Sequence, residues 1–246
     1  MLPVLNLNNR DPQHSEHSEH NEQCRAALEV ASRVVVALYA NPRIGPSIAK
    51  LVTPLNALGR EQRVLISKLS PFDFFMSPST TKGDLLPTLQ RFRPRVLLIS
   101  GHTLGGKLLL EDENGKLSVN EMVSKSEMEQ LVLQTPSLEL VILMACESTR
   151  IRPSERVLMS TRLRFITWKT VTEDEAALAF TSGAIQQLAR EVKRESGRIN
   201  STAIFEAGLA SFTKSGFRLG DPYGSDLPPD ISEEDRPHGI VELFPE

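Results

Sequence analysis

A histidine and a cysteine each follow an apolar stretch of this sequence, and the two side chains are suited to nucleophilic catalysis. His102 comes after residues 95–100 and Gly101, and Cys146 comes after residues 138–144 and Ala145. A thiol at its ordinary pKa is only slightly ionised near neutral pH, so it needs a nearby base, and a neutral imidazole can take its proton. His102 and Cys146 are therefore a candidate catalytic dyad, with the histidine as base and the cysteine as nucleophile.

Other interpretations of these residue types are open. Cys146 is alternatively a buried structural thiol, because free cysteine is among the most buried residue types. His14, His17 and His20 recur every three residues and could in principle share a metal ion. They stand in a polar Ser-Glu-His run without cysteine or carboxylate ligands in a shaped site, so a solvated segment is the favoured interpretation. We expect no metal and no other cofactor.

The elements that must position the dyad alternate between short apolar runs and helical patterns, which favours a mostly parallel sheet covered by helices on both faces. The expected strands are residues 33–39, 64–69, 95–100, 138–144 and 163–168. The expected helices are residues 45–58, 82–92, 119–134, 173–193 and 201–213. Residues 108–117 predict a hairpin around Asn114-Gly115, and residues 149–160 predict a surface connection. From Arg218 onward the sequence predicts irregular chain.

The two strands that precede the dyad are expected to end at the same edge of this sheet. In open parallel sheets, ligands and reacting groups gather beyond the carboxyl ends of the strands, where the connecting loops converge. The sequence therefore predicts that His102 and Cys146 meet in one crevice.

The ordered motifs resemble the caspase-like cysteine peptidases of clan CD, and within them the CHAT domains related to caspases and separases. The resemblance covers about residues 33–225 and includes the stretches 96–102 and 140–148, the hairpin between them, and Trp168 with the Val-Thr-Glu-Asp-Glu run at 171–175. It implies a caspase-like three-layer α/β/α sandwich with a mostly parallel sheet. It also implies a thiol protease in which Cys146 attacks a peptide carbonyl and His102 protonates the departing amine.

One position departs from the family pattern, which commonly has glycine directly after the catalytic histidine. Here that residue is Thr103, whose backbone N–H, together with that of Cys146, is the expected oxyanion hole. A β-branched residue restricts the backbone, especially where a positive φ is required, so Thr103 is expected to weaken or abolish activity.

The substrate pocket is less defined by the sequence. Glu173, Asp174 and Glu175 stand where separase-like relatives carry acids, and such acids would favour arginine or lysine before the cut. The favoured alternative is an acidic first helical turn that is stabilised by the helix dipole. Trp168 is expected in the core or in a pocket wall.

Composition limits the remaining choices. The chain has 246 residues, 40% of them apolar, with 28 basic and 31 acidic side chains evenly mixed. This predicts a polar tail over residues 1–24 and one domain over residues 25–246, with neither nucleic acid nor a membrane as partner. With two cysteines and no secretory signal pattern, the chain is expected to be cytoplasmic.

We therefore expect a cysteine endopeptidase that acts on protein or peptide substrates, and an activating protein partner stays open. The alternative from another class is a non-catalytic CHAT-like effector or interaction module of a signalling protein, in which Thr103 marks a decayed site.

Overall fold

The computed structural model describes residues 34–43, 55–71, 73–194, 197–228, 230–232 and 235–245. The chain divides into two units, residues 1–32 and 33–246, and all described residues belong to the second. The three tail histidines, the boundary at residue 24 and residues 45–54 of the expected helix at 45–58 lie outside the described residues. Residues 55–57 are not helical, and Leu58 begins another helix.

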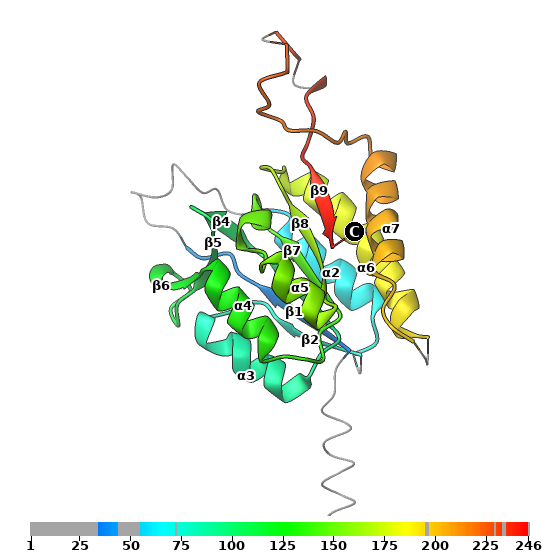
Figure 1. Ribbon diagram of the computed structural model, residues 1–246. Coiled ribbons are helices and arrows are strands. Elements are labelled where there is room, and N and C mark those ends of the chain that lie inside the picture. The colour runs from blue at the N-terminus through cyan, green and yellow to red at the C-terminus, as the bar shows by residue number, and fades with distance from the viewer. Residues whose placement is uncertain are drawn as a thin grey trace, which may run out of the picture. The chain divides into compact units, whose positions relative to one another are not determined.

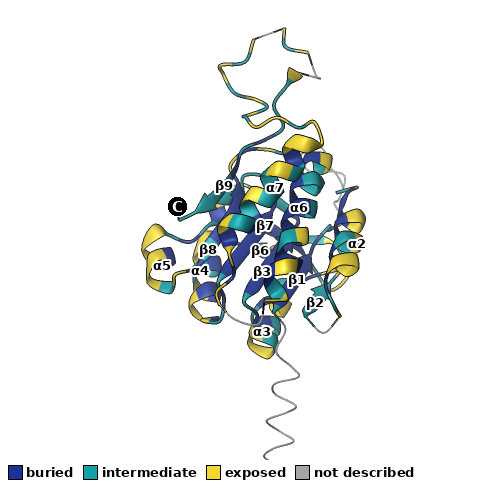
Figure 2. Cartoon of the chain, turned by 90° about the vertical axis from the view of Figure 1, so that its right-hand side faces the viewer, coloured by how far each residue is buried: buried dark blue, intermediate teal, exposed yellow. Residues whose placement is uncertain are grey.

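A six-stranded sheet forms the centre of the second unit, in the order β2-β1-β3-β7-β8-β9 (Figure 1). Its strands are β1 (Val35–Tyr39), β2 (Phe74–Ser77), β3 (Val96–Ser100), β7 (Leu140–Met144), β8 (Arg164–Trp168) and β9 (Val241–Phe244). All neighbours pair in parallel except β9, which runs antiparallel to β8. Every residue of β1, β3 and β7 is buried, because helices cover both faces of these strands (Figure 2).

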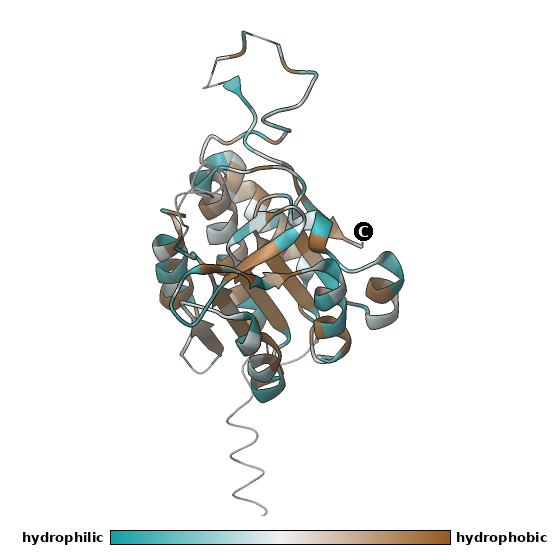
Figure 3. Cartoon of the chain, turned by 90° about the vertical axis from the view of Figure 1, so that its left-hand side faces the viewer, coloured by the Kyte–Doolittle hydropathy of each residue, from teal (hydrophilic) through white to brown (hydrophobic). Residues whose placement is uncertain are grey.

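Two apolar cores lie on opposite faces of the sheet. Alternate residues of β1, such as Val35 and Val36, contribute to one core and then the other. The first core is completed by α2 (Leu58–Lys68), α6 (Asp174–Val192) and α7 (Ser201–Lys214). The second is completed by α3 (Lys82–Phe92), α4 (Lys125–Leu133) and α5 (Glu155–Thr161). The hydropathy colouring shows apolar strands between helices with polar outer faces (Figure 3), and the expected three-layer sandwich is confirmed.

Three expectations for single elements are wrong. Residues 64–69 are not a strand but mostly the end of α2, whose buried Leu58, Glu61 and Leu65 recur at helical spacing. The helix expected from residue 119 begins instead at Lys125, because the N-cap Ser124 and Glu127 form a capping box there. The C-terminal chain, which was expected to be irregular, contains the edge strand β9, whose four residues pair with β8.

The expected hairpin is confirmed and belongs to a separate three-stranded sheet. Its strands are β4 (His102–Leu104), β5 (Lys107–Glu111) and β6 (Leu117–Val123), all antiparallel. The surface connection after β7 contains a 3₁₀ turn, η1 (Ser148–Ile151), and the short helix α5. None of the helices in the described parts of the chain combines the length and apolar character needed to cross a membrane.

The close contact of α6 with α7 depends on Gly183. A Cβ atom at this position would lie 2.3 Å from the carbonyl oxygen of Ala207 and 2.5 Å from Cβ of Ser211. We expect Gly183→Ala to destabilise the fold by about 1–3 kcal/mol, because overpacking outweighs alanine's higher helix propensity. Urea unfolding would measure the change. The matched control is Gly59→Ala in α2, where the nearest side-chain atom is 3.9 Å from the added Cβ; equal destabilisation by both variants would contradict the prediction.

Candidate active site

The structure brings His102 and Cys146 to the same edge of the sheet. Ser100 of β3 and Met144 of β7 are paired residues of adjacent parallel strands, and each candidate residue comes two positions later. The N–H of Gly101 donates to the carbonyl oxygen of Met144 at 3.1 Å, so the two strand ends stay in register where the chain leaves the sheet. His102 then begins β4, at the transition to the smaller sheet.

Cys146 is held by the loop that follows β8. Its Sγ accepts a hydrogen bond from the N–H of Thr172 at 3.4 Å and donates to the carbonyl oxygen of Thr172 at 3.6 Å. Burial raises the pKa of the thiol, and the charges of Asp174 and Glu147 act in the same direction, while the Thr172 N–H opposes them. The resting side chain is therefore a neutral thiol.

His102 is available as a base. Burial lowers the pKa of its imidazole, and the charge of Asp174 acts against this shift. Its Nε2 is buried and has no hydrogen-bond partner among the described residues. Nor does a hydrogen bond join His102 to Cys146 within that part of the chain. Hydrogen bonds between catalytic groups often become short only when substrate is bound, so an imidazole nitrogen without a partner is compatible with proton transfer from the Cys146 thiol in a substrate complex.

Thr103 lies in an ordinary strand conformation. It pairs with Leu108 in the β4–β5 ladder and is not one of the residues with positive φ, so its β-branched side chain fits the backbone there. Its Oγ1 donates a hydrogen bond to the carbonyl oxygen of Cys146. Thr103 thus links the backbone of Cys146 to β4, and the backbone strain that would follow from a positive φ is absent at this residue.

A residue with left-handed backbone conformation follows Cys146 instead. Glu147 has φ 50° and ψ 25°, a conformation that non-glycine residues adopt rarely. It is held there by its N–H, which donates to Thr170 at 3.0 Å, and by an ion pair with Arg150 at 2.8 Å. The N–H of Cys146 forms no hydrogen bond with another residue in the described parts of the chain, and its interaction with its own Sγ lowers the pKa of the thiol.

A small cavity lies between α2 and α6, and neither His102 nor Cys146 lines it. It has a volume of about 30 Å³, and its nine lining residues are Leu55, Ala57, Leu58, Glu61, Ser100, Met144, Asp174, Ala177 and Leu178. Two carboxyl groups and no basic side chain line it. Ser100 and Met144 are the paired residues that precede the dyad, so the cavity opens beside the same two strand ends.

Glu61 is the residue of this site that the sequence analysis missed. It is only 4% exposed, and its Oε2 accepts a hydrogen bond from the Ser100 hydroxyl at 2.6 Å. Burial raises the pKa of Glu61 to about 7, hydrogen bonds with Ser100 and Thr181 oppose the shift, and the charge of Asp174 adds to it. One sequence feature could have indicated that Glu61 is buried. Glu61 lies three residues after Leu58 and four before Leu65, which places its carboxylate on the apolar face of a helix.

The other expected substrate residues have separate positions. Glu173 is the N-cap residue of α6, and Glu175 pairs with Arg60 at the surface. Trp168 is only 1% exposed and packs in the core against Phe180. Of the acidic run, only Asp174 lines the cavity, and its Oδ2 accepts the N–H of Asn56 at 2.8 Å.

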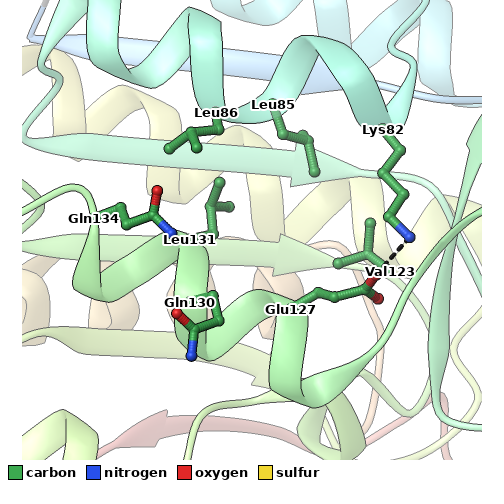
Figure 4. A pocket seen from close by; sticks show the side chains of 8 residues that line it. All are labelled: Lys82, Leu85, Leu86, Val123, Glu127, Gln130, Leu131 and Gln134. Carbon is green, nitrogen blue, oxygen red and sulfur yellow. Dashed lines mark ion pairs between the residues drawn. The ribbon is translucent and has the colours of Figure 1, made fainter.

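A second hollow lies on the other face of the sheet, between α3 and α4 (Figure 4). Leu85, Leu86 and Leu131 supply apolar surface, and Lys82 forms an ion pair with Glu127 at its edge. No residue of the dyad or of its adjoining loops lines it, so it is not part of this site. No group of three or more potential metal-ligating side chains occurs in the described parts of the chain.

The model of the CHAT domain family matches residues 11–211, so the chain belongs to the CHAT domain family. The resemblance identified in the sequence is thereby confirmed. No curated protein matches the chain.

Solved structures of cysteine peptidases are similar to this chain at low sequence identity. A secreted C11 cysteine protease from Bacteroides thetaiotaomicron, in complex with an irreversible peptide inhibitor, is 12% identical, with a TM-score of 0.47, over 86% of this chain and 65% of that one. The Arg-specific cysteine proteinase gingipain R is 11% identical, with a TM-score of 0.48, over 87% and 47%. Caspase-1 from Spodoptera frugiperda is 10% identical, with a TM-score of 0.47, over 87% and 86%. The chain thus spans less than two thirds of the first two proteins.

Proposed function

We propose that this protein is a cysteine endopeptidase with a His102–Cys146 dyad. The observation that carries the proposal is the placement of both residues two positions beyond a paired residue of the adjacent parallel strands β3 and β7. Family membership adds to it, since a resemblance to caspase-like peptidases implies this pairing.

The chemistry follows from the resting state of the two groups. When a peptide carbonyl approaches Sγ of Cys146, His102 takes the thiol proton and the sulfur adds to the carbonyl carbon. The N–H groups of Cys146 and Thr103 are the proposed oxyanion donors, and a donor of this kind is worth about 3 kcal/mol. The imidazolium then protonates the leaving amine, and a water molecule activated by His102 releases the acyl group.

A specific observation favours the alternative of a non-catalytic interaction module. Both the N–H and the carbonyl of Thr172 contact Sγ of Cys146, and the pKa of the thiol is raised rather than lowered. A structural thiol would be held in the same way. The alternative predicts no hydrolysis, whereas the peptidase predicts hydrolysis that depends on Cys146.

Cleavage of a positional-scanning peptide library by the full chain tests the proposal, with cut positions identified by mass spectrometry. We expect cleavage after basic residues that falls to background in Cys146→Ala, because the sulfur is the attacking atom. The matched control is Cys146→Ser, which keeps the size of the side chain but replaces the thiol. Cleavage that persists in Cys146→Ala would contradict the proposed dyad, and no cleavage by the unmodified protein would favour the interaction module.

A further inference from the structure

The loop that contacts Cys146 is itself attached to the C-terminal segment, residues 215–240, which joins α7 to β9. The pairing of β8 with β9 continues past the two strands, because the N–H of Lys169 donates to the carbonyl oxygen of Ile240 at 2.8 Å. The N–H of Ile240 in turn donates to Oγ1 of Thr170 at 2.9 Å. Thr170 is only 8% exposed, and its carbonyl oxygen accepts the N–H of the residue that follows Cys146. Thr170 therefore connects the turn at Cys146 to the C-terminal segment.

Gly239 brings the same segment against Thr172. Gly239 has φ 140°, and a Cβ atom there would lie 2.4 Å from Oγ1 of Thr172, so this contact requires glycine. The Thr172 hydroxyl is buried and has no hydrogen-bond partner among the described residues. A buried polar atom normally has a partner, so the observed position of Thr172 leaves one hydrogen bond unmade. Exposure of the loop to water would supply that hydrogen bond.

The C-terminal segment is paired with itself where it reaches the loop. The N–H of Gly220 donates to the carbonyl oxygen of Gly239 at 3.0 Å, and the N–H of His238 donates to the carbonyl oxygen of Arg218 at 2.9 Å. Arg218 also forms an ion pair with Asp235 at 3.0 Å. Because of these contacts, a movement of the segment would carry Gly239 with it.

The contact with Thr172 competes with the proposed catalytic contact. Sγ of Cys146 donates to the carbonyl oxygen of Thr172 at 3.6 Å, and a thiol has a single proton to donate. Nε2 of His102 has no hydrogen-bond partner among the described residues. The thiol proton is therefore directed at Thr172, and Cys146 must leave this contact before His102 can accept the proton.

We propose that this arrangement is an autoinhibitory contact, in which the Thr172 backbone withholds the Cys146 thiol from His102 and the C-terminal segment keeps Thr172 in place. The inference rests on the proposed peptidase function and adds how its nucleophile is controlled. Separation of Gly239 and Ile240 from the loop after β8 releases the thiol. A segment remote in sequence from both dyad residues thereby regulates the site.

The first test measures the rate at which iodoacetamide alkylates Cys146 at pH 8, with the modified peptide quantified by mass spectrometry. Thr170→Val keeps the size and branching of the side chain but removes the acceptor for the Ile240 N–H. We expect it to raise the rate roughly 3- to 10-fold, the effect of one lost hydrogen bond. Thr170→Ser keeps the hydroxyl and should stay near the unmodified rate. The matched control is Thr135→Val, which removes a buried hydroxyl that bonds to Leu131 of α4 and should leave the rate unchanged.

Gly239→Ala disturbs the same contact from the other side. The added Cβ would clash with the Thr172 hydroxyl, so the loop must move, and alkylation of Cys146 should accelerate at least as much as in Thr170→Val. Gly216→Ala is the control, because Gly216 also has a positive φ of 89° but a Cβ there meets no atom within 4 Å. Circular dichroism and urea unfolding establish that each variant is folded during alkylation. An unchanged or slower rate in both Thr170→Val and Gly239→Ala would overturn the inference.

Peptide cleavage by the same variants separates this inference from the peptidase itself. We expect kcat/KM of Thr170→Val to rise by a factor similar to that for alkylation, and cleavage that appears only in the variants would support both proposals. Faster alkylation with slower cleavage would show that the contact supports catalysis, which overturns the inference and leaves the peptidase. Faster alkylation without cleavage by any variant would contradict the peptidase and leave the contact as a control of access to the thiol.

Discussion

Replacing His102 by alanine is expected to lower kcat/KM for peptide cleavage about 10²- to 10⁴-fold, the usual contribution of a general acid and base. The structure gives a reason why the activity should depend strongly on His102. Burial raises the pKa of the Cys146 thiol, so little thiolate forms without a base. Burial also lowers the pKa of His102, which keeps its imidazole neutral and able to accept the proton near neutral pH.

The pH profile separates a base from a residue that only supports the fold. With His102 present, kcat/KM should rise with pH through a value below the ordinary histidine range and then level off. In His102→Ala this rise at low pH should disappear. The remaining rate should increase only at a pH above the ordinary pKa range of cysteine, where the thiol ionises. The matched control is His238→Ala, since His238 accepts a hydrogen bond from the N–H of Arg218 in the C-terminal segment. If His102→Ala lowers kcat/KM but leaves the shape of its pH profile unchanged, a role of His102 as base would be contradicted.

The central strands could be predicted from sequence because their burial is nearly complete. Residues of β3 and β7 are apolar without alternation, and a run of this kind between turn signals is typical of a strand covered on both faces. The inference from a short apolar run to a strand was wrong at residues 64–69, because the run that begins at Val64 belongs to an amphipathic helix. β9 has only four residues, and its pairing with β8 depends on contacts made by distant parts of the chain.

The common position of His102 and Cys146 could be predicted from sequence because each residue stands two positions after a buried strand of a parallel sheet, where reacting groups gather. Glu61 was not, because no local pattern indicates that a carboxylate on α2 hydrogen-bonds to Ser100 across the core. The concern about Thr103 depended on φ, and φ at that position is set by the β4–β5 pairing. The strained conformation lies at Glu147, where the sequence carries no glycine to signal it.

Glu61 also predicts how stability depends on pH. Its pKa rises from 4.5 to about 7 on folding because burial disfavours the charged form. Between these two values the folded state binds more protons than the unfolded state, so the free energy of unfolding falls as pH rises. The contribution of Glu61 is fully present below pH 4.5 and is lost as the pH passes through about 7. A difference of about 2.5 pKa units corresponds to roughly 3 kcal/mol.

We therefore expect Glu61→Gln to be more stable than the unmodified protein at pH 8, by up to about 3 kcal/mol, and to lose most of this advantage by pH 5. Glutamine keeps an acceptor for the Ser100 hydroxyl but carries no charge, so it removes the cost of burying a carboxylate. Urea unfolding at pH 5, 6, 7 and 8 would measure the difference between the two proteins, in which the titration of all other groups largely cancels. Glu175→Gln serves as the control, because that side chain is exposed and should give no such pH-dependent difference.

Equal pH dependence in Glu61→Gln and the unmodified protein would show that Glu61 is not a buried, proton-binding group. A carboxylate buried in the core destabilises the protein at a pH at which it is ionised, even with hydrogen bonds from Ser100 and Thr181, and its replacement by glutamine removes that cost together with the charge.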